Sequence, residues 1–391
     1  MRERVEAILA DERVRRAFRY ILENEAAIEA GQIRITRIPA PPFGEAARAE
    51  CFASELREIG LSPVTDEIGN VIAGYESIGS HPVVVAAHLD SVFPAATPLE
   101  LRRQGRFLYL PGISDSGAGI VALLWSLRAA RHAGLRFRRP VVAVGNVGEE
   151  GEGNLRGIRY LFNAPPWEGR EGRASDFIAV DGGGLERVTH QALGSRRFRI
   201  RMTGPGGHSW ADFGRPNPVH AIAGAIHAFT NAGAGRRPGT SFNVGVVRGG
   251  ISVNAIPSEA FMEVDLRSIN PANLDDLDNH LKMAVMDAVA DFRVECKVEK
   301  MGERPSGKTP VTEPVVQAAL EATRRFGVEP QLDIGSTDAN IPMSLGIPAV
   351  AIGAGGAAGD VHTPGEWFDP TNRHLGMQRL LTLIAALAGL E

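Results

Sequence analysis

Residues 83–90 read Val-Val-Val-Ala-Ala-His-Leu-Asp, a short apolar run that ends in a histidine and an aspartate. Such a run, rich in β-branched residues, predicts a buried strand. Residues 141–144, 177–180 and 349–352 have the same character, and an apolar helical pattern covers 118–131. Strands of this kind that alternate with helices are typical of a mostly parallel sheet with helices on both faces. The sequence therefore predicts an α/β domain.

The middle of the chain has a different pattern. Polar and apolar residues alternate over 196–202, as in a strand with one buried face. From there to residue 299 the predicted order is strand, helix, strand, strand, helix, strand, which is a ferredoxin-like unit with an antiparallel sheet. We therefore expect a lid domain at 194–302, inserted into a domain that consists of residues 1–193 and 303–391.

The composition is that of a globular protein with a full core, because 44% of the 391 residues are hydrophobic and 23% are charged. A formal net charge of −4 argues against nucleic acid or an anionic membrane as a partner. No apolar run approaches the roughly 20 residues that span a bilayer, and the charged N-terminus lacks the apolar core of a signal peptide. Cys51 and Cys296 are the only cysteines, too few for a disulfide scaffold or a cysteine metal site. We expect a cytoplasmic protein.

His88 and Asp90 end the first predicted strand. Residues i and i+2 of a strand share a face, so Asp90 can accept the second ring N–H of His88 and fix its tautomer. Ligands bind at the carboxyl ends of strands in such sheets. Taken alone, however, His88 is better explained by a structural role in the core.

Three more candidates occupy comparable places. Asp115 lies in a Gly-rich loop before the helical pattern, where an N-cap is the alternative role. Asp181 directly follows the run at 177–180, and His362 lies beyond the run at 349–352 and a Gly-rich loop. Their positions predict that all three side chains reach the same edge of the sheet.

Glu149 and Glu150 follow the run at 141–144. Adjacent carboxylates at a strand end repel one another unless a cation or a shared proton holds them. A solvated acidic turn that includes Glu152 is the alternative.

Taken together, the candidates form a set of nitrogen and oxygen donors without a thiolate, which suits Zn²⁺, with Mn²⁺ or Co²⁺ as alternatives. Five ligands are too many for one catalytic zinc, but they fit two metals about 3.5–4 Å apart if one carboxylate bridges them. Glu149 then has no ligand role, and a water held by two metals needs a base beside it. The set comprises His88, Asp115, Glu150, Asp181 and His362.

The order of these motifs resembles that of the dinuclear zinc exopeptidases and deacylases. That family includes peptidase T, aminoacylase, acetylornithine deacetylase, succinyl-diaminopimelate desuccinylase and carboxypeptidase G enzymes. The resemblance covers nearly the whole chain, including the inserted lid. It implies that Asp115 bridges the two metals, with His88 and Asp181 on one metal and Glu150 and His362 on the other.

The resemblance also implies roles beside the metals. Glu149 would be the general base and Asp90 would orient His88. Family members commonly have a cis peptide bond after the bridging aspartate, so we expect one between Asp115 and Ser116.

Two motifs of the lid resemble those of the family. Residues 204–209, Gly-Pro-Gly-Gly-His-Ser, are similar to its Gly-His-Ser motif, which implies that His208 stabilises the oxyanion in the active site of a partner subunit. The runs Asn254-Ala-Ile-Pro and Asp-Leu-Arg267 resemble the pair that holds a substrate carboxylate. The resemblance thus implies a homodimer formed through the lid. The alternatives are a turn histidine and an arginine paired at the surface.

Other classes of protein fit the sequence less well. The Gly-rich run at 353–359 is not followed by an apolar helix that would bind a pyrophosphate. The chain has no Gly-x-Ser-x-Gly motif, which argues against a serine hydrolase. A non-catalytic binding protein on the same fold would be expected to have lost ligands or the base, whereas this chain keeps all six.

The sequence therefore predicts a metal-dependent hydrolase of amide bonds in small substrates, with a metal-bridging hydroxide and Glu149 as general base. Residues 336–342, Ser-Thr-Asp-Ala-Asn-Ile-Pro, resemble the peptidase T-like branch and favour di- or tripeptides. An N-acyl amino acid deacylase is the alternative, because both activities use one mechanism and the metal ligands do not distinguish them. Many family members have the motif Asp-x-Lys at the bridging aspartate, whereas this chain has Asp115-Ser-Gly, which loosens the substrate assignment but removes no ligand. The direction of cleavage, from the amino or the carboxyl end, stays open.

Overall fold

The structure is a computed structural model that describes residues 1–167, 174–231, 233 and 237–391. The chain forms two compact units. The first consists of Met1–Ala192 and Lys308–Glu391, and the second of Leu193–Gly307. The predicted lid, residues 194–302, lies within the second unit.

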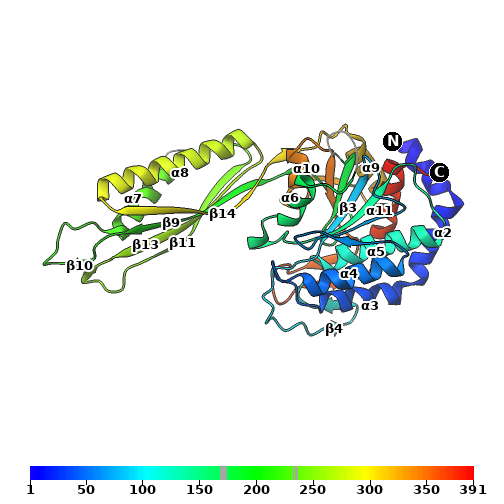
Figure 1. The fold of residues 1–391 in the computed structure, drawn as a ribbon, viewed down its shortest axis with the longest axis horizontal. Coiled ribbons are helices and arrows are strands. Elements are labelled where there is room, and N and C mark those ends of the chain that lie inside the picture. The colour runs from blue at the N-terminus through cyan, green and yellow to red at the C-terminus, as the bar shows by residue number, and fades with distance from the viewer. Residues whose placement is uncertain (168–173, 232, 234–236) are drawn as a thin grey trace. The chain divides into compact units, whose positions relative to one another are not determined.

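The first unit is built on a large sheet that includes β3 and has helices packed around it (Figure 1). Its strand order is β1-β2-β6-β3-β7-β17-β8. Strands β6, β3, β7 and β17 are parallel to one another, while β2 pairs antiparallel with β6, and β8 pairs antiparallel with β17 and parallel with β16. The order continues to β15 (Gly307–Lys308), and β16 (Gln331–Gly335) pairs with β8. The other bounds are β1 (Val64–Thr65), β2 (Val71–Gly74), β3 (Val83–His88), β6 (Val141–Asn146), β7 (Asp176–Val180), β8 (Arg187–Ala192) and β17 (Ala349–Ile352). The predicted α/β class with a mostly parallel sheet is confirmed.

Alternate residues of β3 enter two different cores because successive side chains of a strand point to opposite faces. Val83 and Val85 pack in the core that includes residues of α5 and α11, and Val84 packs in the core that includes residues of α6 and α10. Helices on the first face are α1 (Arg2–Ala10), α2 (Glu12–Glu23), α3 (Glu25–Thr36), α4 (Ala46–Glu58), α5 (Gly117–His132), α9 (Pro314–Arg325) and α11 (Arg373–Ala388). Those on the second are α6 (Arg156–Asn163) and α10 (Asn340–Ser344). Burial on both faces explains why β3 and β6 are apolar runs rather than alternating ones.

A smaller antiparallel sheet, in the order β18-β19-β5-β4, belongs to the same unit. Its strands are β4 (Arg102–Gln104), β5 (Phe107–Tyr109), β18 (Ala357–Gly359) and β19 (Trp367–Asp369). Trp367 pairs with Tyr109, so β5 and β19 lie side by side although they are far apart in sequence. The loop that contains His362 joins β18 to β19, and the loop that contains Asp115 follows β5. The small sheet therefore holds these two loops together.

The second unit has a four-stranded antiparallel sheet in the order β11-β13-β9-β14, packed against helices α7 and α8 (Figure 1). A separate two-stranded ladder joins β10 to β12. The element order is β-α-β-β-α-β once that ladder is set aside, as predicted for a ferredoxin-like unit. The bounds are β9 (Gly194–Thr203), β10 (Gly207–His208), α7 (Pro218–Asn231), β11 (Thr240–Gly249), β12 (Ala255–Ile256), β13 (Glu259–Ser268), α8 (Pro271–Phe292) and β14 (Glu295–Arg304).

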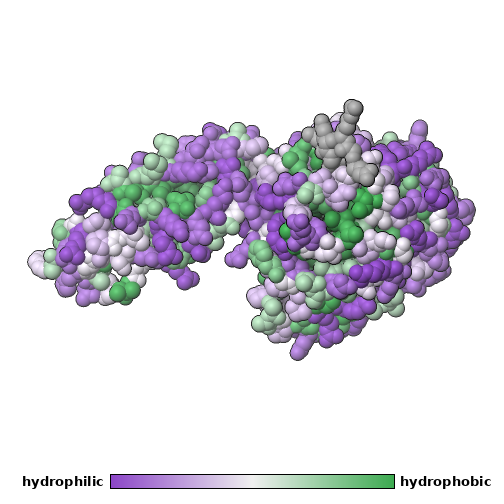
Figure 2. Space-filling view, viewed as in Figure 1, coloured by the Kyte–Doolittle hydropathy of each residue, from purple (hydrophilic) through white to green (hydrophobic). Residues whose placement is uncertain are grey.

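Hydrophilic residues cover much of the visible surface, with patches of hydrophobic residues on each unit (Figure 2). In the second unit, Trp210, Phe213, Ile251 and Val253 are among the most exposed large hydrophobic residues. No helix in the described part of the chain is long and apolar enough to cross a membrane.

Candidate metal centre

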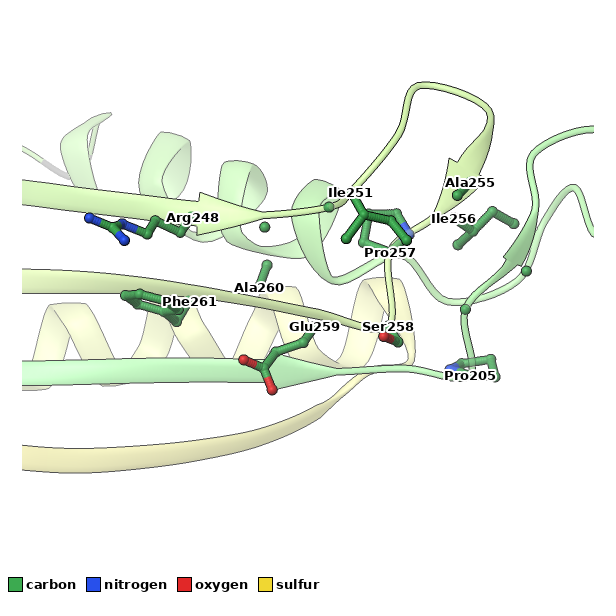
Figure 3. A pocket seen from close by; sticks show the side chains of 14 residues that line it. Pro205, Arg248, Ile251, Ala255, Ile256, Pro257, Ser258, Glu259, Ala260 and Phe261 are labelled. Atoms are coloured by element: carbon green, nitrogen blue, oxygen red, sulfur yellow. The ribbon is translucent and has the colours of Figure 1, made fainter.

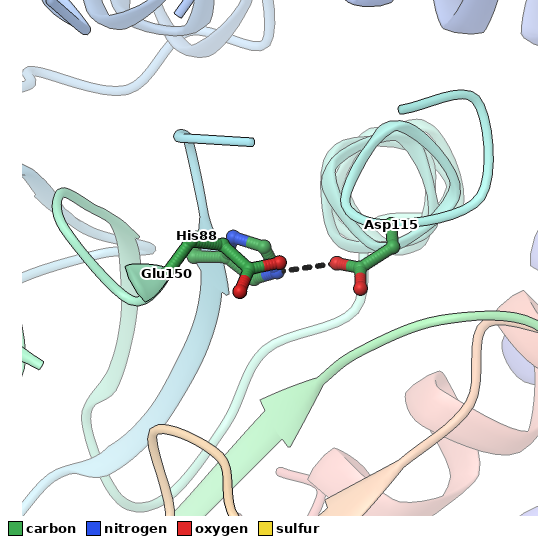
Figure 4. Close-up of side chains that lie close together, drawn as sticks. All are labelled: His88, Asp115 and Glu150. Atoms are coloured by element: carbon green, nitrogen blue, oxygen red, sulfur yellow. Dashed lines mark ion pairs between the residues drawn. The ribbon is translucent and has the colours of Figure 1, made fainter. Parts of the chain in front are cut away.

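Five side chains of the first unit meet at the carboxyl edge of the parallel strands. His88 ends β3, Asp181 follows β7, and Glu150 lies beyond β6. Asp115 precedes α5, and His362 lies in the loop between β18 and β19. In the close-up view, the side chains of His88, Asp115 and Glu150 converge from three different segments (Figure 4). The structure thus brings together all five residues that the sequence suggested as ligands.

Asp115 lies between the two histidines. Its Oδ1 is 2.9 Å from His88 Nε2, and its Oδ2 is 3.0 Å from His362 Nε2. A second carboxylate lies near the Nε2 atom of each histidine: Asp181 Oδ1 is 3.7 Å from His88 Nε2, and Glu150 Oε1 is 3.0 Å from His362 Nε2. The cluster therefore divides into two histidine–carboxylate sets that share Asp115.

The donor atoms fit a divalent metal centre. One donor atom each of His88, Asp115 and Glu150 lies within 4.8 Å of the other two. Among the described residues, the buried atoms His88 Nδ1 and Asp115 Oδ1 have ion-pair contacts but no hydrogen bond of good geometry, although buried polar atoms in proteins nearly always have one. Imidazole and carboxylate donors without a thiolate suit zinc, manganese or cobalt.

Charge is concentrated in this cluster. Contacts with Asp115 and Glu150 raise the pKa of His362 to about 10. Burial opposes a charge on His88, but its contacts with Asp115, Asp181 and Asp90 outweigh this and hold the pKa of His88 well above its ordinary value. Burial also opposes a charge on Asp115, whose pKa is nevertheless lowered by the two histidines. The carboxylates therefore require positive charge beside them, which protons or bound cations can supply.

Asp90 supports the loop that contains the two adjacent glutamates. Its Oδ1 accepts the backbone N–H of Glu149 at 2.9 Å, and its Oδ2 accepts that of Glu150 at 2.7 Å. His88 Nδ1 is 3.5 Å from Asp90 Oδ1, an ion-pair distance that is longer than a hydrogen bond. All of these residues are buried, and Glu149 is only 5% exposed. Asp90 thus contacts both the His88 strand and the Glu149–Glu150 loop.

The backbone at Asp115 and at His362 has unusual features. The peptide bond between Asp115 and Ser116 is cis, which confirms the prediction made from the family resemblance. His362 has a φ of 66°, a left-handed conformation that few residues other than glycine adopt. Asp115 is not the N-cap of α5, because Ser116 occupies that position and makes no side-chain cap.

Glu366 is a site residue that the sequence analysis missed. Its Oε2 accepts the N–H of Gly112 at 2.9 Å, and its Oε1 accepts those of Ser114 at 2.8 Å and Asp115 at 3.1 Å. Burial raises the pKa of Glu366 to about 7, against the effect of these three N–H donors. In the sequence, the only sign that Glu366 belongs to the site is its position four residues after His362. Glu366 connects the His362 segment to the Asp115 loop.

Asp338 is a second residue that the analysis missed. Asn146, which is paired with His88 across the sheet, donates a hydrogen bond from Nδ2 to Asp338 Oδ2 at 2.8 Å. Asp338 Oδ1 is buried and has no hydrogen-bond partner in the part of the chain that the structure describes, and burial raises the pKa of Asp338 to about 7. Asp338 lies in the run at 336–342, whose resemblance to the peptidase T-like branch does not indicate a buried carboxyl group. A buried carboxyl group therefore contacts Asn146 of β6, the residue paired with His88.

In the second unit, His208 and Asn254 are neighbours. Residues of β10 and β12 pair, with His208 opposite Ala255, and the N–H of Ser209 donates to Asn254 O at 3.0 Å. His208 is exposed, and its Nδ1 accepts the N–H groups of Trp210 at 3.2 Å and Ala211 at 3.4 Å. In the neutral ring the proton then lies on Nε2, which makes that nitrogen a donor.

Arg267 lies on β13, where its Nε contacts Asp265 Oδ2 at 2.6 Å. The arginine is thus paired within its own unit. A cavity of about 500 Å³ also lies in this unit, beside the β10–β12 ladder (Figure 3). Its labelled lining includes the apolar side chains of Ile251, Ile256 and Pro257, with Arg248 and Glu259 as its charged members.

Comparisons with known sequences extend over most of the chain. The profile of Peptidase family M20/M25/M40 matches residues 84–386. The protein YqjE of Bacillus subtilis is 24% identical over 362 residues, which cover 88% of this chain and 93% of YqjE. A succinyl-diaminopimelate desuccinylase of Nautilia profundicola is 23% identical over 311 residues, or 75% of this chain and 80% of that enzyme.

Solved structures share the fold. A tripeptidase of Staphylococcus aureus aligns with a TM-score of 0.79 at 21% identity, over 93% of this chain and 99% of its own. Aminopeptidase PepT of Bacillus cereus aligns with a TM-score of 0.76 at 19% identity, over 93% of this chain and 99% of its own. The dinuclear metal-binding peptidase YXEP of Bacillus subtilis aligns with a TM-score of 0.68 at 16% identity, over 93% of this chain and 98% of its own. Because the family profile matches most of the chain, the protein belongs to Peptidase family M20/M25/M40 and is a metallo-hydrolase that acts on amide bonds.

Proposed function

We propose that the protein is an exopeptidase that cleaves di- and tripeptides with the help of two divalent metal ions. The observation that carries this proposal is the position of Asp115, whose two oxygens face two different histidines at 2.9 and 3.0 Å. A carboxylate in that position is suited to bridge two cations. His88 and Asp181 would complete one site, and Glu150 and His362 the other.

Two bound cations would polarise the scissile carbonyl and make a water molecule more acidic. Zinc is the metal we propose, with manganese and cobalt as alternatives, because the donors are imidazole and carboxylate groups. The protein itself supplies the arrangement of the donors and the groups that move protons.

Glu149 is the proposed general base. It is buried, it adjoins the ligand Glu150, and its N–H is bound by Asp90. Its carboxylate would take a proton from the attacking water and pass it to the leaving amine. Asp90 acts indirectly, since it holds the Glu149–Glu150 backbone and lies beside His88.

The second unit would contribute groups that bind the substrate. His208 would donate from Nε2 to the oxyanion in the active site of a partner subunit, which requires a homodimer formed through the second unit. The donor state of Nε2 supports this role because Nδ1 accepts two backbone N–H groups. Asn254 and Arg267 would hold a substrate carboxylate, with Arg267 released from or shared with Asp265.

Peptides are the preferred substrate class because two structural neighbours are named a tripeptidase and an aminopeptidase. An N-acyl amino acid deacylase is the second candidate, and the similarity to a desuccinylase favours it. Both reactions need the same metal centre. We propose a cytoplasmic location for either activity.

The test is a panel of di- and tripeptides and N-acyl amino acids, assayed with added Zn²⁺, Mn²⁺ or Co²⁺. We expect hydrolysis of short peptides with at least one of these metals and its loss with a chelator. Hydrolysis of N-acyl amino acids alone would favour the deacylase. Failure to hydrolyse any amide in the panel, with metal bound, would reject the proposed function.

A further inference from the structure

Two separate groups hold the short loop that carries the proposed general base. This loop, residues 147–150, directly follows β6. The carboxylate of Asp90 accepts the backbone N–H of Glu149 at 2.9 Å. A second contact comes from α6, whose first residue, Arg156, donates its backbone N–H to Gly148 O at 3.2 Å. The loop is therefore fixed between Asp90 and the start of α6.

The side chain of Arg156 also lies against Gly148, the residue before Glu149. A Cβ atom added to Gly148 would come within 2.6 Å of Arg156 Cγ and 2.9 Å of its Cδ, closer than non-bonded atoms approach. Gly148 has a φ of 65°, in the left-handed region that glycine adopts without strain. The aliphatic stem of Arg156 thus packs directly on the Gly148 backbone and blocks a shift of this backbone towards it.

Several contacts restrict Arg156 to this place. Its Nη2 donates to both carboxylate oxygens of Glu45 at 2.8 Å, and its Nη1 donates to Ile68 O at 2.9 Å. Its guanidinium carbon lies 4.9 Å from the ring centroid of Phe43, within the range of a cation–π contact. The side chain of Glu45 is only 4% exposed. Because a charge shielded from water needs a partner, Glu45 anchors the arginine beside Gly148.

We propose that Arg156 is a positioning residue for the general base. Its side chain, anchored by Glu45, holds the backbone at Gly148 and so determines where the Glu149 carboxylate lies. This inference rests on the proposed role of Glu149 and adds a residue that acts through it. Proton transfer requires the base to lie within hydrogen-bond reach of the water, so a displacement of about 1 Å can cost on the order of 10²-fold in rate.

Arg156→Ala removes both the stem and its anchor. At saturating Zn²⁺ we expect it to lose about 10- to 100-fold in kcat on a tripeptide, with KM and metal content little changed. Hydrogen–deuterium exchange provides a measurement without turnover, and residues 147–150 should exchange about tenfold faster because local opening becomes easier. Arg156→Lys keeps a stem beside Gly148 and a charge beside Glu45, so it should recover part of both losses.

Arg128→Ala is the matched control. The Arg128 side chain is 23% exposed, as is that of Arg156, and its guanidinium carbon lies 5.2 Å from the ring of Trp125. Within the described residues its hydrogen bonds go to Glu55 at 2.9 Å and Glu58 at 3.2 Å, not to the loop at 147–150. Arg128→Ala should keep its kcat and the slow exchange of that loop, even where its Tm falls.

Unchanged exchange of residues 147–150 in Arg156→Ala would overturn the proposal, whatever the activity. So would faster exchange with an unchanged kcat, a loss of kcat that matches a loss of metal, or a loss that Arg128→Ala shares. If Arg156→Ala does not fold, Glu45→Gln takes its place, since it keeps the shape of the anchor but removes its charge. The same faster exchange is expected there, and its absence would again overturn the proposal. Turnover by Glu149→Gln decides separately whether Glu149 is the base.

Discussion

The carboxylate of Glu366 accepts the backbone N–H of Asp115 at 3.1 Å, so the residue proposed to bridge two metals is held by a glutamate 251 positions later in the chain. The same carboxylate binds the N–H groups of Gly112 and Ser114. Glu366 follows His362 by four residues, so it connects two segments that carry proposed ligands. Groups of this kind, which touch the ligand segments rather than the metal, commonly set metal affinity.

Glu366→Gln should therefore weaken metal binding. An amide can keep the two N–H groups on one oxygen, but its NH₂ would face the N–H of Gly112, and two donors cannot pair. We expect metal affinity to fall by about 10- to 100-fold, measured by competition with a chromophoric chelator. Asp369→Asn is the matched control, since the buried Asp369 side chain accepts the N–H of Thr371 and pairs with Arg106, and its hydrogen bonds among the described residues do not reach a proposed ligand segment. Equal affinity in Glu366→Gln and the unaltered protein would show that this contact does not hold the centre.

Glu149 and Glu150 are adjacent but have different proposed roles, so their amide variants should differ. Glu149→Gln should keep both metals and lose at least about 10²-fold in kcat, the scale expected for a general base. Glu150→Gln should lose metal as well. Metal content by mass spectrometry and kcat on a tripeptide measure the two effects. Near-normal turnover of Glu149→Gln at full metal occupancy would contradict the assignment.

Metal removal should destabilise the first unit. A metal that binds only the folded state adds about 2.7 kcal/mol when it is present at 100 times its Kd. A chelator should therefore lower the Tm, and added zinc should restore it. Glu150→Gln provides the control, because its Tm should respond less to the chelator. A Tm that does not depend on metal, in a protein shown to lose metal, would argue against a centre that binds in the folded state.

His208 and Arg267 should affect different kinetic constants. His208→Ala should lose about 10²–10³-fold in kcat with metals retained, as expected for an oxyanion donor. Arg267→Ala should instead raise KM for peptides with a free carboxylate and affect amidated peptides less. Amidated and free forms of one tripeptide separate the two effects. Equal changes in KM for both forms would remove Arg267 from carboxylate binding.

A mixing experiment tests whether His208 acts in a partner subunit. Combining the inactive Glu149→Gln and His208→Ala chains should restore up to about a quarter of the sites if subunits exchange freely. Restored activity would require one chain to supply His208 to the other. Absence of activity despite proven heterodimers would place His208 in its own chain's site or outside catalysis.

The fold class could be predicted from sequence because local patterns encode it. The apolar run of β3 is buried on both faces, and the alternating run of β13 has one buried face. Four ligand candidates could be found because each follows a strand of the large sheet or precedes helix α5, and His362 could be found because it lies beyond the apolar run of β17 and a Gly-rich loop. Glu366 and Asp338 could not be predicted in this way. The hydrogen-bond partners of Glu366 are 251 to 254 residues away and that of Asp338 is 192 residues away, and no local periodicity encodes such contacts. A local pattern does point to the pairing of Arg267 with Asp265, because the two residues are neighbours on one face of a strand.

The most direct test of the central claim is the anomalous diffraction of zinc-loaded crystals, measured on both sides of the zinc absorption edge. The account predicts two zinc peaks in each first unit, about 3.5–4 Å apart, the spacing of two-metal hydrolytic sites. One peak should lie between Asp115 and His88, and the other between Asp115 and His362. A single peak, or two peaks that do not share Asp115, would contradict the account.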